Sequence, residues 1–294
     1  MPETMRPETA GKVPVIECFT LAWRFMNANW RLLLAAAAIT AVLSQAGVAL
    51  VLAVRPTNAT QSMLAVTLWD VIAMLPAMVA SMLFTAVVLR KAIRDEFIGP
   101  TGLAFGADEV RLLAVALALM CLLLPLGGLF FFVMTGVVLS RLASSPEQLD
   151  ILLNDPEAMS AALEAALGPT GVLAFVLFAI LVMALAVYIS VKLVMVNAAT
   201  IGERRVVIFQ TWAWSRGNMW RALGALILTA LPVFFLGNIL ESLRLGVLEA
   251  APGMVTLVAT NALVGFVLAM GGIPSIALGA ILYKGLRPAD FVAK

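Results

Sequence analysis

The chain of 294 residues contains no histidine, only two cysteines and few charged side chains. Without histidine, most metal sites, histidine-based acid–base pairs and serine triads of the usual form are excluded. Cys18 and Cys121 lie too far apart in sequence and setting to predict a disulfide framework or a zinc site. The net charge of +2 is too small to predict binding to nucleic acid.

The sequence also lacks the short motifs that commonly mark catalytic sites. It has no phosphate-binding loop, no Gly-x-Ser-x-Gly, no Cys-x-x-Cys and no His-Glu-x-x-His. With one acidic side chain inside a predicted membrane span, a general acid–base pair is hard to assemble. We therefore expect no enzyme activity, no catalytic residue, no cofactor and no metal site.

Apolar residues dominate what is present. They make up 63% of the chain, charged residues make up 12%, and the mean hydropathy is +1.04. Soluble domains carry about 45–50% apolar and about 25% charged residues, so this composition predicts an all-α polytopic membrane bundle. A span needs roughly 20 apolar residues. Six segments meet that length: 32–54, 63–89, 112–140, 171–196, 222–240 and 254–283.

The distribution of Lys and Arg predicts the orientation. With six spans, the N-terminus, 90–111, 192–221 and the C-terminus share one side of the membrane. That side carries all of the 19 Lys and Arg residues except Arg55, Arg141 and Arg244. Cytoplasmic loops are enriched in Lys and Arg, so both termini are expected in the cytoplasm.

The longest extracytoplasmic loop, 141–170, carries the signals of two short helices. In Ser145-Pro146-Glu147 and in Asp155-Pro156-Glu157, a capping residue precedes a proline at the first helical position. Gly168-Pro169 ends the second helix. The acidic side chains of this loop are interpreted as a solvated face, and a cation site is the less favoured alternative.

The stretch 203–221 is rich in tryptophan and arginine, and it is predicted to lie at the membrane surface, to turn at Gly217-Asn218 and to continue into a span. Residues 22–31 form a degenerate copy, because both contain Ala-Trp, an asparagine and then Trp-Arg. The first copy belongs to an amphipathic surface helix over 15–30 whose tryptophans suit the headgroup level. Its apolar stripe consists of Ile16, Phe19, Trp23, Met26 and Trp30.

These copies predict an internal two-fold repeat. Each repeat is a surface helix and two spans that end in Lys-x-(Ile/Leu)-Arg, at Lys91–Arg94 and Lys284–Arg287. Both repeats begin in the cytoplasm, so a pseudo-two-fold axis along the membrane normal is expected. The small residues Gly271, Ser275 and Gly279 predict close helix packing. The expected organisation is a disordered leader (1–14), the first repeat (15–94), central spans (95–196), the second repeat (197–287) and a tail (288–294).

Asp70 is the only acidic residue inside a predicted span, and Ser81 and Thr85 share its helical stripe. An intramembrane carboxylate is costly, which makes this stripe a candidate polar site for a proton or a cation. A wet acid at the interface is the alternative, because Asp70 lies near the outer end of its span. Asn238 and Glu241 are further candidates for the same polar pocket.

A second candidate is a cytoplasmic surface that binds anionic lipid headgroups or a partner protein. The alternative is simple interfacial anchoring, and snorkelling accounts for the lysine at the end of the fourth span. The candidate residues are Trp23, Trp30, Arg31, Lys192, Arg204, Arg205, Trp212, Trp214, Arg216, Trp220 and Arg221.

Two stretches carry a resemblance to a known family. They are Gly202-Glu203-Arg204 followed by Ala213 to Arg221, and Phe105-Gly106-Ala107-Asp108-Glu109-Val110-Arg111-Leu112. With these motifs the chain resembles bacterial six-helix membrane proteins of unknown function, similar to the membrane domain of some glycerophosphodiester phosphodiesterases. The resemblance implies a fold and a bacterial inner-membrane location. It implies no activity, because the phosphodiesterase chemistry belongs to a separate histidine-containing domain.

Two functions follow as expectations. The first is a non-enzymatic structural or accessory membrane protein that interacts with lipids or with a membrane-protein complex through its Trp/Arg surface. The alternative is a transporter or channel for a small solute, ion or lipid that uses the polar site around Asp70. A homo-oligomer is left open, and a membrane-embedded enzyme ranks last.

Overall fold

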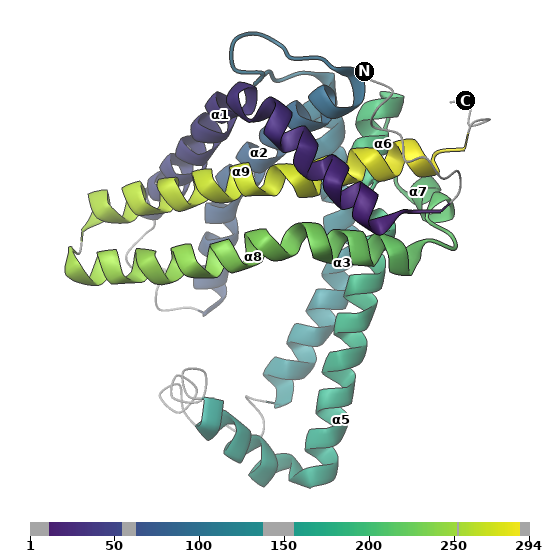
Figure 1. Ribbon diagram of the computed structural model, residues 1–294. Helices are drawn as coiled ribbons and strands as arrows, with labels where there is room; N and C mark the ends of the chain where they lie inside the picture. The colour runs from purple at the N-terminus through teal and green to yellow at the C-terminus, as the bar shows by residue number, and fades with distance from the viewer. Residues whose placement is uncertain (1–11, 55–62, 138–155, 252, 289–294) are drawn as a thin grey trace. The chain divides into compact units, whose positions relative to one another are not determined.

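The computed structural model describes residues 12–54, 63–137, 156–251 and 253–288, and some helical side chains within these ranges lie outside the description. The described residues form helices joined by turns, with no strand among them. The chain divides into unit 1 (Met1–Val115 and Val191–Lys294) and unit 2 (Ala116–Ser190). Figure 1 shows the helices α1 (Val15–Val54), α2 (Met63–Arg94), α3 (Ala107–Val137), α5 (Pro156–Leu193), α6 (Val196–Glu203), α7 (Phe209–Trp214), α8 (Met219–Ala250) and α9 (Met254–Leu286).

Among the described residues, five helical segments are long and apolar enough to cross a membrane, which is compatible with a multi-pass membrane protein. They are Val15–Val48, Ile72–Arg94, Leu167–Glu203, Met219–Ala250 and Val255–Leu286. They overlap five of the six predicted spans. The third predicted span, 112–140, coincides with most of α3, but its last residues lie outside the described part of the chain. The all-helical fold is therefore confirmed, and the number six stays a prediction.

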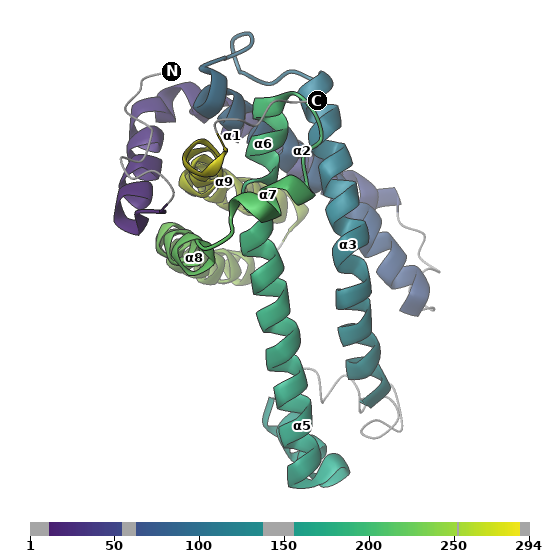
Figure 2. The same ribbon diagram turned by 90° about the vertical axis from the view of Figure 1, so that its right-hand side faces the viewer.

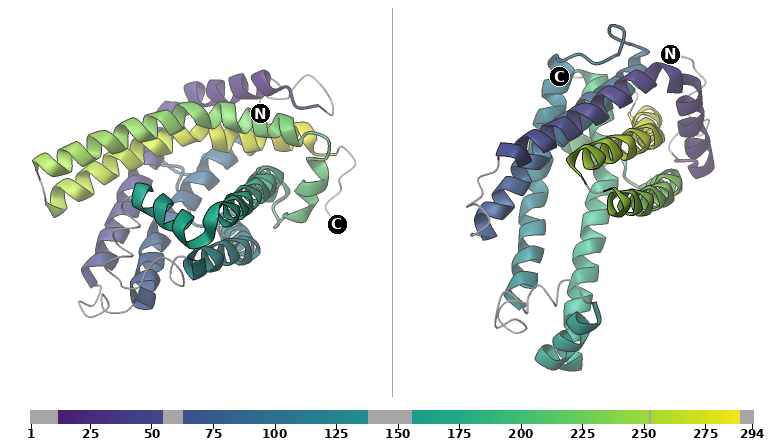
Figure 3. Two further views of the ribbon diagram at one scale, coloured as in Figure 1. Left: turned by 90° about the horizontal axis from the view of Figure 1, so that it is seen from below. Right: turned by 90° about the vertical axis from the view of Figure 1, so that its left-hand side faces the viewer.

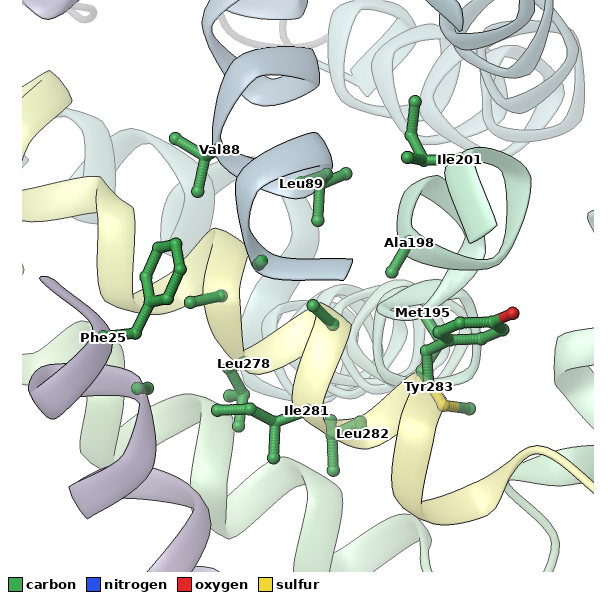
Figure 4. Packing of buried hydrophobic residues seen from close by; sticks show 14 of the residues in the cluster. Phe25, Val88, Leu89, Met195, Ala198, Ile201, Leu278, Ile281, Leu282 and Tyr283 are labelled. Carbon is green, nitrogen blue, oxygen red and sulfur yellow. The ribbon is translucent and has the colours of Figure 1, made fainter. Parts of the chain in front are cut away.

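Unit 1 is built from two helical hairpins, α1–α2 and α8–α9. The helices α8 and α9 lie side by side along their length, and α1 packs most extensively on α9 and α2 (Figures 1 and 3). α6 bridges the ends of α2 and α9 (Figure 2). Figure 4 shows side chains of α1, α2, α6 and α9 meeting around Leu278, Ile281 and Leu282. All three are at least 98% buried, so the end of α9 forms the centre of this core.

The helix α1 differs from the expectation of a separate surface helix followed by a span. It is continuous from Val15 to Val54 and changes direction about midway (Figure 1). The face that packs inward recurs every three or four residues, as expected for a helix with one buried stripe. This buried face comprises Cys18, Leu21, Ala22, Phe25, Leu33, Ala36, Ala37, Thr40 and Ala41. The stripe predicted from Ile16 to Trp30 lies beside it, and Ile16 is 74% exposed.

The segment just before α1 also belongs to the core of unit 1. Val13 is 4% exposed, and its N–H donates to the Asn218 Oδ1 at 3.0 Å. Val13, which the sequence assigned to the leader, is therefore packed on unit 1. Residues 1–11 of that leader lie outside the described residues.

Unit 2 contains most of α3 and of α5. Helix α5 begins at Pro156 with Glu157 in its first turn, and it breaks at Gly168, which has φ 65° and ψ 171°. Because a positive φ strongly favours glycine, the break falls where the sequence places the residue best able to adopt it. The predicted second short helix and its end at Gly168-Pro169 are confirmed. The first short helix lies within 138–155, outside the described residues.

A tight contact between α1 and α2 at Gly47 predicts a sensitive position. A Cβ added at Gly47 would lie 2.2 Å from the Pro76 Cβ. We expect Gly47→Ala to lower the free energy of unfolding by about 1–3 kcal/mol, because the two helices must move apart. In the matched control Gly272→Ala in α9, no atom lies within 4 Å of the new Cβ. That control should raise the free energy of unfolding by about 0.5–1 kcal/mol. Thermal unfolding in detergent measures both, and equal stability of the two variants would contradict the contact.

Candidate functional site

The Trp/Arg-rich stretch folds as the end of α6, the short helix α7, a turn and the start of α8. Arg204 ends α6 in the left-handed conformation, with φ 53°. Gly217 has φ 79°, and α8 begins directly after Asn218. The predicted turn at Gly217-Asn218 is confirmed. The first copy of the motif lies instead within the uninterrupted α1, so the two copies differ in local backbone structure.

Two residues predicted for the lipid or partner surface lie inside unit 1. Trp214 is 9% exposed, and its ring centroid lies 6.1 Å from that of Tyr283. Lys192 is 6% exposed, and its Nζ lies 5.9 Å from the centroid of the Trp212 ring, within cation–π range. The assignment of Trp214 and Lys192 to an accessible surface is corrected, because the fold packs both against its own aromatic rings.

At the start of α8, by contrast, the side chains predicted for the lipid or partner surface are exposed. Trp220 is 76% exposed, and Arg216 and Arg221 beside it are exposed as well. Trp212 and Arg205 are only partly exposed. We call Arg216, Trp220 and Arg221 the Trp220 surface, since these three side chains are accessible together at one helix end.

The remaining candidates are dispersed. Arg204 is exposed and reaches Glu96 at 3.7 Å. On α1, Trp30 is 43% exposed with the Arg31 guanidinium 5.3 Å from its ring centroid, while Trp23 is partly exposed. These side chains suit an interface, but none of them combines high aromatic exposure with two neighbouring exposed cations.

A buried ion pair lies where α2 ends and α3 begins. Arg90 and Glu109 are 2% and 1% exposed, and the Arg90 Nη1 lies 2.5 Å from the Glu109 Oε1. Arg90 also donates to the Gly102 carbonyl at 3.0 Å, and Glu109 accepts from the Gly106 N–H at 2.9 Å. Glu109 is the third residue of α3, and it bonds back to the N–H of the residue before the helix, as the glutamate of a capping box does. Both charges are compensated within the protein.

Sequence reasoning missed this pair as a functional or structural centre. The only local signal is Gly106 followed three residues later by Glu109, directly before an apolar run. Arg90 carries no local signal, because its partner lies nineteen positions away.

Arg94 joins the same region to α6. Its guanidinium pairs with Asp108 and with Glu96, and it donates to the Ile201 carbonyl at 3.4 Å. Asp108 also accepts from Arg111 at 2.8 Å. Arg94 therefore ties the C-terminal end of α2 both to the first turn of α3 and to the last turn of α6 by charge-assisted hydrogen bonds.

The end of α2 is capped from two directions. Asp95 has φ 59° directly after the helix, and its carboxylate lies 2.6 Å from the Lys91 Nζ. The hydrogen bond from Lys91 lowers the pKa of Asp95 below its ordinary value. Lys284 donates to the carbonyls of Ala92 and Ile93 at 3.1 and 3.3 Å, which satisfies acceptors that a helix end leaves free.

The end of α9 is tied to α6 through Glu203. Its carboxylate accepts from the Tyr283 hydroxyl at 2.6 Å and lies 2.6 Å from the Arg287 Nε. A Cβ at Gly202 would lie 2.5 Å from the Tyr283 hydroxyl, so a glycine permits this approach. The two Lys-x-x-Arg ends of the predicted repeats thus lie in one polar region, joined through Lys284.

The candidate polar site on α2 is only partly assembled. Thr85 lines a cavity of about 220 Å³ together with Asn197 and Ser275. Ser81 is exposed and does not line it, and the Asp70 side chain lies outside the described side chains. Asn197 and Ser275 were not among the residues that the sequence singled out for this site.

Asn238 and Glu241 are exposed and line a shallow, open hollow of about 450 Å³ along α8 and α9. The Glu241 carboxylate is held by Arg244 at 2.8 Å, and Arg244 also donates to Asn261 at 3.3 Å. Ser275 lines this hollow as well as the smaller cavity.

No cluster of three or more potential metal ligands occurs within the part of the chain that the structure describes. Comparison of the chain with protein-family models, with curated proteins and with solved structures finds no match.

Proposed function

We propose that the chain is a non-enzymatic, multi-pass protein of the bacterial inner membrane that binds anionic lipid headgroups and acts as a structural or accessory partner. In this proposal six spans place both termini in the cytoplasm, and two related thirds lie side by side with their tryptophan-rich segments at the inner leaflet. A homo-oligomer or a complex with another membrane protein is compatible with it.

The observation that carries the proposal is the Trp220 surface. A tryptophan that is 76% exposed contributes little to the core, whereas Trp214 in the same stretch is packed inside. Tryptophan is favoured at headgroup level, and neighbouring arginines attract anionic lipid phosphates. Trp220 and Arg221 lie in the first turn of α8, and Arg216 lies in the turn before it, where the helix dipole favours negative charge.

The proposal predicts selective retention of anionic lipid. The full chain in detergent is offered equal amounts of phosphatidylglycerol and phosphatidylcholine, and the retained lipids are identified by native mass spectrometry. We expect phosphatidylglycerol to be enriched. Each arginine removed by Arg216→Gln or Arg221→Gln should lower that enrichment about fivefold, since one cation near an anionic surface contributes about 1 kcal/mol.

Two matched variants control for general effects. Arg287→Gln removes an arginine whose guanidinium is already held by Glu203, and Phe235→Leu shortens an aromatic side chain of α8 that is 58% exposed. Both should retain lipid as the unmodified chain does. Equal retention of the two lipids, or enrichment that is indifferent to Arg216 and Arg221, would refute the proposed function.

The alternative function is transport through a site around Asp70, and the structure changes the set of residues that would form that site. Of its three residues, Thr85 lines a cavity and Ser81 does not. A transport site would therefore depend on Thr85, Asn197 and Ser275, which line that cavity together.

A further inference from the structure

The cavity of about 220 Å³ in unit 1 is lined by α2, α9, α6 and the turn before α6. All of its described lining residues belong to three segments that are apolar enough to cross a membrane: Ile72–Arg94, Leu167–Glu203 and Val255–Leu286. One water occupies about 30 Å³ in the liquid, so the cavity has room for several hydrogen-bonding groups. We propose that it binds the uncharged, hydroxyl-bearing headgroup of a neutral membrane lipid, independently of anionic lipid at the Trp220 surface.

Each of the three helices contributes one neutral polar side chain to the cavity: Thr85 from α2, Asn197 from α6 and Ser275 from α9. Among the described residues, these three side chains have no hydrogen-bond partner. Thr40 and Thr229, by contrast, each donate to the carbonyl four residues earlier in their own helix. A polar group without a partner is costly in apolar surroundings, so the three side chains have donors and acceptors to offer a ligand.

The local packing leaves this space between the helices. Helix α5 ends at Leu193 and α6 begins at Val196, so the chain turns beside the cavity. A Cβ at Gly279 would lie 3.0 Å from the Val194 carbonyl, so a glycine lets α9 approach this turn closely. At membrane depth, irregular backbone is tolerated where it is buried in protein or lines a cavity.

The lining selects against a charged headgroup. None of the described lining residues is ionisable, so a phosphate or an ammonium group would have no opposite charge there. Thr85 and Ser275 each lie nine residues before a charged helix end, Arg94 and Lys284. Nine residues correspond to about 14 Å along a helix. An uncompensated charge at that depth is costly, whereas a hydroxyl can be satisfied by the hydroxyl and amide side chains.

The remaining lining suits the apolar part of a lipid. Leu89, Val194 and Ile276 place apolar surface beside the polar side chains. Asn197 is exposed, whereas Thr85 and the serine of α9 are partly buried, so the cavity opens at Asn197. Because this opening lies within apolar segments, the ligand reaches it from the bilayer and its acyl chains can stay there.

Dioctanoylglycerol is the probe, because it is uncharged and carries one free hydroxyl and two ester carbonyls. The full chain is kept in dodecyldimethylamine oxide, a detergent without hydroxyl groups, and binding of the radiolabelled probe is measured at equilibrium by scintillation proximity. We expect saturable binding that unlabelled dioctanoylglycerol displaces. Dioctanoylphosphatidic acid has the same chains and a phosphate on the hydroxyl, and it should not displace the probe.

Thr85→Val and Ser275→Ala each remove one hydroxyl from the cavity without filling it. Each should weaken probe binding about fivefold, as expected for the loss of one neutral hydrogen bond. Ser81→Ala is the matched control on α2, because Ser81 is exposed and does not line the cavity, and it should leave binding unchanged. Without the probe, both cavity variants should keep the unfolding temperature of the unmodified chain, since the hydroxyls that they lose have no partner among the described residues.

Three results would overturn the proposed site: no saturable binding, binding that neither cavity variant weakens, or equal displacement by dioctanoylphosphatidic acid. Displacement by free glycerol at the concentrations that suffice for dioctanoylglycerol would assign the cavity to a soluble solute and overturn the lipid as its ligand. Trp220→Leu should lose selectivity for phosphatidylglycerol but bind the probe as the unmodified chain does. Failure of this test and failure of the proposed function are therefore distinguishable.

Discussion

Arg90→Met is expected to lower the free energy of unfolding by about 3–5 kcal/mol, because it leaves a buried carboxylate without its partner. Glu109 is 1% exposed and would keep only its hydrogen bond from the Gly106 N–H. The Gly102 carbonyl would lose its donor at the same time. The measurement is chemical or thermal unfolding of the purified chain in detergent.

The adjacent residue supplies the control. Lys91 pairs with Asp95, whose side chain is 52% exposed, and exposed pairs contribute about 0–1 kcal/mol. Lys91→Met should therefore change stability little. The double variant Arg90→Met/Glu109→Leu should recover much of the loss, since replacing a buried pair by apolar residues is often neutral. If Arg90→Met and Lys91→Met were equally stable, the Arg90–Glu109 pair would not be desolvated as described.

Trp214→Ala should lower the free energy of unfolding by about 3–5 kcal/mol, as large-to-small core substitutions of tryptophan do. Its ring packs beside that of Tyr283, whose hydroxyl in turn bonds to Glu203. Removing the indole would leave a cavity next to the contact that joins α9 to α6. Thermal unfolding of the purified chain in detergent measures this loss of stability.

Trp220→Ala is the matched comparison, because the same side chain is removed six residues along the same stretch. At 76% exposure it should change stability by no more than about 0.5 kcal/mol. It should instead lower lipid retention in the assay described above. Similar losses of stability for both tryptophans would contradict their different placement.

Several elements could be predicted from the sequence because local chemistry determines them. The predicted sixth span begins at Met254, and so does α9. The turn at Gly217 and the break at Gly168 fall where glycine is needed for a positive φ. The start of α5 at Pro156 follows from proline's fixed φ and its missing N–H.

The candidate site was less predictable, because its residues come together from distant parts of the chain. Thr85 was named from its helical stripe, but Asn197 and Ser275 lie more than a hundred positions away and share no local pattern with it. Lys284 was recognised as part of a repeated ending, yet its bonds to the carbonyls of α2 have no sequence signature. Trp214 and Trp220 read alike in the sequence, and only the packing on Tyr283 separates them.

The sequence by itself determined that the chain is helical and rich in segments apolar enough to cross a membrane, because apolar run length and composition act residue by residue without regard to distant contacts. It also located the starts of α2, α5 and α9, because capping and backbone conformation depend on immediate neighbours. Only the tertiary structure decided which tryptophans are buried, which charges pair and where cavities remain. Those outcomes depend on the faces that helices turn toward each other, and helical periodicity does not specify which of several apolar stripes will find a partner.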